Sequence, residues 1–102
     1  MRPKKIRWIK QKPKDSCFKP LCKPLSKLQS VYLTLDEFEA IRLRYFEGLK
    51  QALASKKMKV SRPTFSRIEA SAQKKIADAL VNVKAIRIKG GCCKMIGRKS
   101  CF

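Results

Sequence analysis

A turn of only three residues, Lys59-Val60-Ser61, separates two stretches that both have the residue pattern of an α-helix. Ser61 is a strong N-cap for the second stretch, and Pro63 falls in its first turn, where a missing N–H group costs nothing. We therefore predict helices over about residues 50–58 and 62–81. Because the connection is so short, the two helices are expected to cross at a fixed angle.

Apolar residues recur at helical spacing on both predicted helices and define the sides that face a core. On the longer helix, which would be about 30 Å long, the predicted buried stripe consists of Phe65, Ile68, Ala72, Ile76, Ala79 and Leu80. On the shorter helix, the residues that can face inward are Leu53, Ala54 and Met58. Arg62, Thr64, Ser66 and Arg67 fall largely off the longer stripe, so we expect them at the surface.

A further helix is predicted before these two. Thr34 as N-cap and Glu37 three residues later form a capping box, and Gly48 is expected to end the helix. Its predicted apolar face consists of Leu35, Phe38, Ile41, Tyr45, Phe46 and Leu49. Four of the seven acidic residues, at positions 36, 37, 39 and 47, lie in this helix. We therefore expect it to support the core and to face away from a polyanion.

The two ends of the chain differ from this helical centre. Residues 1–30 form a basic arm interrupted by prolines, residues 31–91 form the predicted helical domain, and residues 92–102 form a basic tail that contains cysteine. Ile6–Ile9 and Lys84–Lys89 have strand-like composition and can pair, which would tie the two ends together. The predicted fold class is mostly α, with a three-helix core and, if these strands pair, a short two-stranded β ribbon.

The charge balance restricts the classes of function. The chain has 26 Lys and Arg against 7 Asp and Glu, a net charge of +19, which favours a polyanion as partner, nucleic acid first and an anionic membrane surface second. It has no run of 18 apolar residues and no secretory signal, so we expect a cytoplasmic protein with no membrane partner. It also lacks histidine, paired carboxylates at an inferred cleft and a glycine-rich phosphate loop. We therefore expect no enzymatic activity, no cofactor and no small-molecule substrate.

These features together predict a helix-turn-helix that binds duplex DNA sequence-specifically and regulates transcription. A major groove admits one α-helix, and Arg62 and Arg67 can make bidentate contacts, each worth roughly 1–3 kcal/mol of base discrimination. The residues predicted to contact DNA at the helix start are Ser61, Arg62, Pro63, Thr64, Ser66 and Arg67. The predicted phosphate contacts are Lys57, Lys59, Lys74 and Lys75, with Arg2, Lys4, Lys5 and Arg7 in the arm. A homodimer is also considered, because a single small module seldom reaches high specificity.

Two alternatives stay open. One is RNA or non-specific nucleic-acid binding, in which Trp8, Phe18 and Phe102 would stack on unpaired bases. The other is a thiolate metal site or redox sensor built from Cys17, Cys22, Cys92, Cys93 and Cys101. We assign no metal ligand, because the four-residue gap between Cys17 and Cys22 lies at the edge of the usual zinc spacing and adjacent cysteines rarely ligate one metal together.

Three segments carry a resemblance to a known family: Leu33-Thr34-Leu35-Asp36-Glu37-Phe38-Glu39-Ala40-Ile41-Arg42-Leu43, Val60-Ser61-Arg62-Pro63-Thr64-Phe65-Ser66-Arg67-Ile68, and Lys84-Ala85-Ile86-Arg87-Ile88 with Gly90-Gly91. Over about residues 2–91 the chain resembles a family of small prokaryotic proteins of unknown function that are predicted to bind DNA. Their helix-turn-helix is similar to region four of RNA polymerase sigma factors. The resemblance implies a DNA-binding, regulatory protein. Lys59 and Val83 stand where the family usually has Gly, and a left-handed Lys at the turn would cost on the order of 1 kcal/mol.

Overall fold

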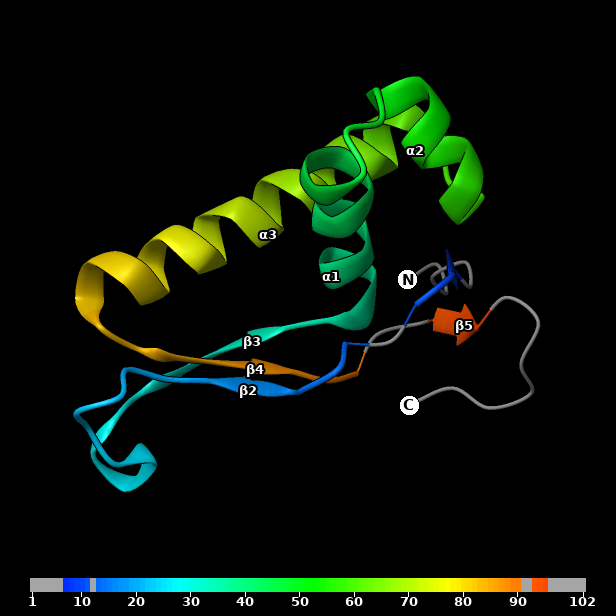
Figure 1. Ribbon diagram of the computed structural model, residues 1–102. Coiled ribbons are helices and arrows are strands. Elements are labelled where there is room, and N and C mark those ends of the chain that lie inside the picture. The colour runs from blue at the N-terminus through cyan, green and yellow to red at the C-terminus, as the bar shows by residue number, and fades with distance from the viewer. Residues whose placement is uncertain (1–6, 12, 91–92, 96–102) are drawn as a thin grey trace, which may run out of the picture.

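The computed structural model describes residues 7–11, 13–90 and 93–95, the last three by their backbone alone. This part of the chain is mostly helical and includes a small mixed sheet of three strands (Figure 1). The helical segments are α1 (Leu35–Ile41), the π-helical η2 (Arg42–Phe46), α2 (Gln51–Met58), α3 (Arg62–Asn82) and the 3-10 turn η1 (Leu25–Lys27). The strands are β1 (Arg7–Ile9), β2 (Cys17–Phe18), β3 (Ser30–Leu33), β4 (Ala85–Ile88) and β5 (Cys93–Met95).

Strand β4 is the centre of the three-stranded sheet. It pairs in parallel with β3, from Ser30 opposite Ala85 to Leu33 opposite Ile88, and antiparallel with β2. Because β3 and β4 are parallel, the chain between them must cross over, and it does so through all three α-helices. Figure 1 shows α1 rising from the end of β3 and α3 returning over the sheet to the start of β4.

The predicted pairing of Ile6–Ile9 with Lys84–Lys89 is wrong, although both segments contribute strands. β1 pairs in parallel with β5, from Arg7 opposite Cys93 to Ile9 opposite Met95. Both neighbours of β4 are other segments, β2 and β3. The alternation of polar and apolar residues marks a strand but does not encode its partner, which depends on where the helices bring the chain back.

Two hydrophobic clusters fill the interior. The cluster between the sheet, α1 and α3 contains the buried residues Ile9, Leu33, Leu35, Ala72 and Ile88. The cluster where the three helices meet contains Ala40, Leu43, Ala54, Met58, Phe65 and Ile68. The single long helix α3 contributes to both, so the sheet and the helical end of the molecule share one support. In the ranges described here, we find no helix that is both long and apolar enough to cross a lipid bilayer.

The helix ends follow the capping residues. The capping box of Thr34 and Glu37 is confirmed, with the Thr34 N–H donating to Glu37 Oε1 at 2.9 Å. Ser61 is confirmed as the N-cap of α3, since its Oγ accepts from the Thr64 N–H at 3.3 Å. The C-cap of α3 is Val83, which has a left-handed φ of 55°.

Three residues predicted to be buried are exposed instead, namely Tyr45, Phe46 and Leu80, and Leu53, which could face inward, is exposed as well. The first two lie in η2, where the Glu47 N–H bonds the Arg42 carbonyl five residues back at 2.8 Å. A π turn shifts the helical phase, so the α-helical spacing assumed for Tyr45 and Phe46 fails. Leu80 follows the buried Ala79, and neighbouring residues on a helix point about 100° apart.

Two buried carboxylates tie α3 to the rest of the fold. Glu37 of α1 accepts from Lys75 Nζ at 2.7 Å and from the Ser71 hydroxyl. Glu69 of α3 accepts from Arg44, from the Tyr45 hydroxyl and from Gln51, at 3.0, 2.7 and 2.8 Å. Burial acts to raise the pKa of each carboxyl, but these hydrogen bonds outweigh it and hold both pKa values below the ordinary Glu value. Both groups are therefore charged at neutral pH.

We expect acid to weaken the fold through these two groups. Because their folded pKa values are lowered, their stabilisation is complete above the ordinary Glu pKa and is lost as pH falls through the folded values. Replacing Glu37 with Gln should cost on the order of 2 kcal/mol at pH 7. The difference between wild type and Glu37→Gln should shrink below about pH 4. Urea unfolding from pH 7 to pH 3 at constant salt measures this, and a difference that stays constant with pH would contradict it.

Backbone strain at Val83 gives a second stability prediction. A β-branched residue in the left-handed region is disfavoured by roughly 1–2 kcal/mol. Val83→Gly and Val83→Ala both remove the side-chain packing, so their difference isolates the backbone conformation. We expect the Gly variant to be the more stable by about 1 kcal/mol in urea unfolding. At the exposed, helical Val81 the order should reverse by a similar amount, and the same order at both sites would refute the explanation.

Candidate nucleic-acid interface

The turn between α2 and α3 is held in one conformation by its own backbone. Lys59 is left-handed, with φ 57° and ψ 44°, and its N–H donates to the Lys56 carbonyl at 3.1 Å. The Val60 N–H donates to the Ser55 carbonyl at 3.1 Å, and the Val60 side chain packs partly buried on the three-helix cluster. These contacts set the angle at which α3 leaves the turn.

The first two turns of α3 have one side packed in the core and one side exposed to solvent. Phe65 and Ile68 are buried, and the intervening Ser66 and Arg67 are exposed together with Arg62. Neither Arg62 nor Arg67 forms an ion pair with any residue that the structure describes. Both guanidinium groups can therefore be offered to an external acceptor without breaking an internal contact.

Ser61, Pro63 and Thr64 lie beside these arginines. Ser61 and Pro63 are exposed, and Thr64 is half-buried. The Ser61 hydroxyl also donates to Thr64 Oγ1 at 2.9 Å, so both hydroxyls are engaged in the cap. Their first role is to start the helix.

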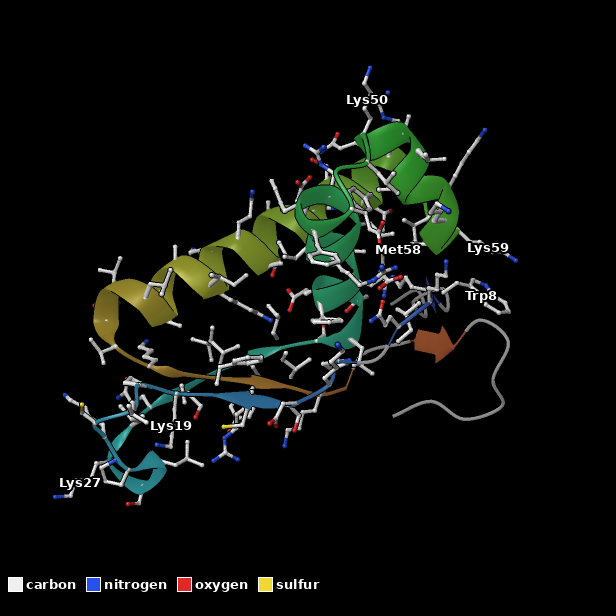
Figure 2. All side chains as sticks on the ribbon, in the orientation of Figure 1. Trp8, Lys19, Lys27, Lys50, Met58 and Lys59 are labelled. Carbon is white, nitrogen blue, oxygen red and sulfur yellow. The ribbon has the colours of Figure 1, made fainter. Side chains whose placement is uncertain are left out.

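Lysines extend the positive charge around the turn. Lys57, Lys59 and Lys74, which the sequence predicted, are all exposed. The Lys59 ammonium lies 4.3 Å from the centroid of the Trp8 ring, which links β1 to the turn. Figure 2 shows Lys50 and Lys59 at the α2 end of the molecule and Lys19 and Lys27 at the opposite end.

A hollow of about 370 Å³ opens beside the turn, and sequence reasoning missed it. Its exposed lining includes four lysines, Lys10, Lys56, Lys57 and Lys59. The buried Arg42 also lines it and is held by Glu39 and Glu47, both at 2.8 Å. The basic composition of α2 was the available signal, but Lys10 comes from a distant segment and no local pattern places it there.

The carboxylates are directed into internal pairs. Of the seven acidic residues, six form ion pairs inside the described part of the chain. Asp36, Glu37, Glu39 and Glu69 are buried. These pairs engage five cationic side chains, namely Arg7, Arg42, Arg44, Lys75 and Lys84, and leave the other described Lys and Arg side chains without a carboxylate partner. The outer surface is therefore dominated by positive charge.

Two predicted phosphate contacts are directed inward. Lys75 donates to Glu37 and, at 2.8 Å, to the Tyr32 carbonyl. Arg7 is buried and lies 3.6 Å from Asp36. The isolated sequence gave no sign of these carboxylate partners, which lie 38 and 29 positions away. Arg2, Lys4 and Lys5 lie outside the described residues.

The residues behind the two alternatives do not assemble into one site among the described residues. Cys17 is half-buried and Cys22 is exposed, and both are free thiols. No group of three potential metal ligands occurs within residues 7–11 and 13–90. Cys92, Cys93, Cys101 and Phe102 lie outside the side chains described. Phe18 is exposed, whereas Trp8 is half-buried beneath Lys59.

Comparison with known proteins adds a family but no activity. Residues 1–96 match the family described as "Protein of unknown function DUF134". A "UPF0251 protein" of Caldanaerobacter subterraneus subsp. tengcongensis is 56% identical over 96 residues, which cover 94% of this chain and 81% of the relative. One from Thermoanaerobacter pseudethanolicus is 56% identical, covering 88% and 76%. One from Dehalococcoides mccartyi is 47% identical, covering 98% and 86%.

No solved structure matches the chain significantly. The family match spans nearly the whole sequence, and its relatives share about half of their residues with it over most of their own length. The chain therefore belongs to the DUF134 family of proteins of unknown function.

Proposed function

We propose that this protein binds duplex DNA sequence-specifically through α2 and α3, acting as a helix-turn-helix, and that it regulates transcription. The observation that carries the proposal is the start of α3. A helix anchored by Phe65 and Ile68 presents Arg62, Ser66 and Arg67 outward, with no described carboxylate paired to either arginine. A helix held in this way can enter a major groove and bring its first turns to the base edges.

The proposed division of labour follows from side-chain chemistry. Arg62 and Arg67 would read bases, since a guanidinium can donate two parallel hydrogen bonds to guanine O6 and N7. Lys57, Lys59 and Lys74 would contact phosphates, because an ammonium is a point charge without that planar geometry. Arg7 and Lys75 are left out of this set, because their charges are already paired.

The burial of carboxylates supports a polyanionic partner. Acidic side chains at the surface would repel phosphate, and in this fold four of them are buried and six are paired. Glu69 follows Arg67 by only two residues, but its carboxylate is directed towards Arg44, Tyr45 and Gln51. The nearest carboxylate is thus bonded to these three side chains and not to the arginines at the start of α3.

Non-specific nucleic-acid binding is a second candidate, because the net charge of +19 favours any polyanion. It differs from the first in what the start of α3 contributes. A purely electrostatic binder would depend on the number of cations it presents and not on Arg62 or Arg67 in particular. Substitution of the two arginines and the salt dependence of binding distinguish the two candidates.

We expect Arg62→Ala and Arg67→Ala each to weaken binding about tenfold to a duplex that the wild-type protein selects from a randomised pool. Binding to an unselected duplex should fall less, so the ratio of the two affinities should drop. Lys27→Ala is the matched control, since Lys27 is an exposed cation at the opposite end of the molecule. Fluorescence anisotropy measures the affinity of all four proteins for both duplexes. Equal losses for Lys27→Ala and the arginine variants would contradict the proposed interface.

Salt dependence tests the phosphate contacts. With about five cations on phosphates or bases, the slope of log K against log salt concentration should be roughly −4 to −5 on duplex DNA. Lys57→Ala should reduce the magnitude of that slope by about 0.9 and leave the preference for the selected duplex unchanged. Single-stranded DNA and RNA of the same length serve as comparisons. Tighter binding to either than to the duplex would contradict the proposal and indicate a protein that binds unpaired strands.

A further inference from the structure

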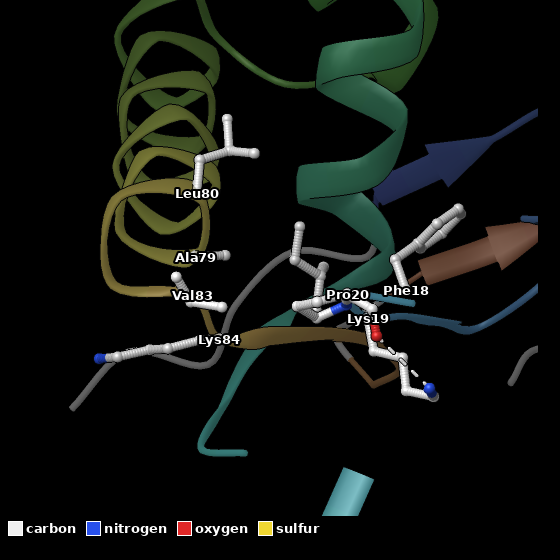
Figure 3. A pocket seen from close by; sticks show the side chains of 8 residues that line it. Phe18, Lys19, Pro20, Ala79, Leu80, Val83 and Lys84 are labelled. Atoms are coloured by element: carbon white, nitrogen blue, oxygen red, sulfur yellow. Dashed lines mark hydrogen bonds between the residues drawn. The ribbon is translucent and has the colours of Figure 1, made fainter. Parts of the chain in front are cut away.

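One side of the molecule carries a continuous apolar surface that the proposed interface does not use. Three hollows of about 300, 350 and 700 Å³ lie there, and they share lining residues. Phe18 lines the smallest and the largest, Leu80 the smallest and the middle one, and Tyr45 the middle and the largest. We call this surface the apolar face and define it by Phe18, Ile41, Tyr45, Phe46, Leu80 and Val83. Figure 3 shows part of it, the smallest hollow, which is lined by Leu80 of α3, by Val83 just after α3, and by Phe18 and Pro20.

The apolar face is large for a protein of this size. Phe46 is 83% exposed, Leu80 74% and Tyr45 53%. Together with the half-exposed Phe18 and Val83, these side chains present on the order of 600 Å². A stable protein interface buries about 800 Å² on each partner, and Ile41, together with the neighbouring Pro20 and Ile76, adds further apolar surface.

The charge around this face distinguishes between occupants. Lys84 is paired with Asp78 at 2.9 Å, and Arg42 is paired with Glu39 and Glu47. The adjacent Lys14 and Asp15 have opposite charges. Lys19 adds one cation that has no carboxylate partner among the described residues, and its Nζ donates to the Pro20 and Lys23 carbonyls. The face is therefore nearly neutral on a chain whose net charge is +19. An acidic partner would find few unpaired cations here, whereas another copy of this cationic chain would meet the least repulsion here.

We propose that the apolar face is the two-fold interface of a homodimer. Residues 62–67 precede Leu80 by 13 to 18 positions, which places the start of α3 about 20–27 Å along the helix axis from the Leu80 end of the face. At its other end the face lies closer to the exposed Arg62 and Arg67, since the Tyr45 hydroxyl donates to Glu69, two residues after Arg67. The proposal does not depend on what those arginines bind.

The test is the mass of the full-length chain in solution. Sedimentation equilibrium is measured from 1 to 200 µM protein in 0.5 M NaCl with a reducing agent, so that neither charge repulsion nor cysteine oxidation decides the result. We expect a dimer at the upper concentrations. Phe46→Glu and Leu80→Glu should each weaken dimerisation at least a hundredfold, because each would bury an unpaired charge in the apolar interface of both copies. Both positions are exposed in the single chain, so these variants should keep the wild-type circular dichroism spectrum.

Leu21→Glu is the matched control, since Leu21 is 93% exposed and lies outside the face. It should dimerise as wild type does. A wild-type monomer at 200 µM would overturn the proposal, as would assembly beyond a dimer. A dimer that Phe46→Glu and Leu80→Glu leave intact, or that Leu21→Glu disrupts equally, would also overturn it.

Failure of this inference can be told apart from failure of the proposed function. Dimerisation is measured without nucleic acid, and duplex binding is measured through Arg62 and Arg67. A monomer whose duplex binding depends on Arg62 and Arg67 would refute the dimer and support the proposed function. A dimer whose duplex binding is unchanged by substitution of either arginine would support the dimer and refute the proposed function.

Discussion

The contact on which the rest of the structure depends is the burial of Phe65 where the three helices meet. Its side chain is fully buried against Ala40 and Leu43 on one side and Ala54 and Met58 on the other. The two alanines are small, which lets the helices approach closely around the ring. Replacing such a side chain with Ala would cost about 3–5 kcal/mol, a large share of the stability of a small domain.

That junction has consequences at both ends of α3. Towards its N-terminus, the junction and the Ser61 cap hold the arginine-bearing turns outside the core. Towards its C-terminus, the same helix covers the sheet through Ala72 and Ile76. Glu37 and Glu69 fasten it sideways to α1 and η2. Several independent contacts thus fix the direction of α3. A helix that presents side chains to a rigid partner needs such a fixed direction.

The features that depend on neighbouring residues could be predicted from the sequence. Thr34 and Ser61 begin helices because a cap acts within three residues. Features that depend on distant residues could not be predicted. The partner of β4 depends on a crossover of three helices, and Lys75 meets a carboxylate 38 positions away. The π turn at Arg42–Phe46 reversed the expected burial of Tyr45 and Phe46 without any local signal.

The distribution of charge links fold and proposed function. The buried carboxylates stabilise the helices through ion pairs. Because these carboxylates are buried, the charged groups on the surface are mainly lysine and arginine. The central claim is that an external polyanion meets this surface at the start of α3. Amide chemical-shift mapping during titration with a selected 20-base-pair duplex tests it most directly. The account predicts that the largest changes fall between Lys57 and Arg67. Largest changes at residues 17–28, at the opposite end of the molecule, would contradict it.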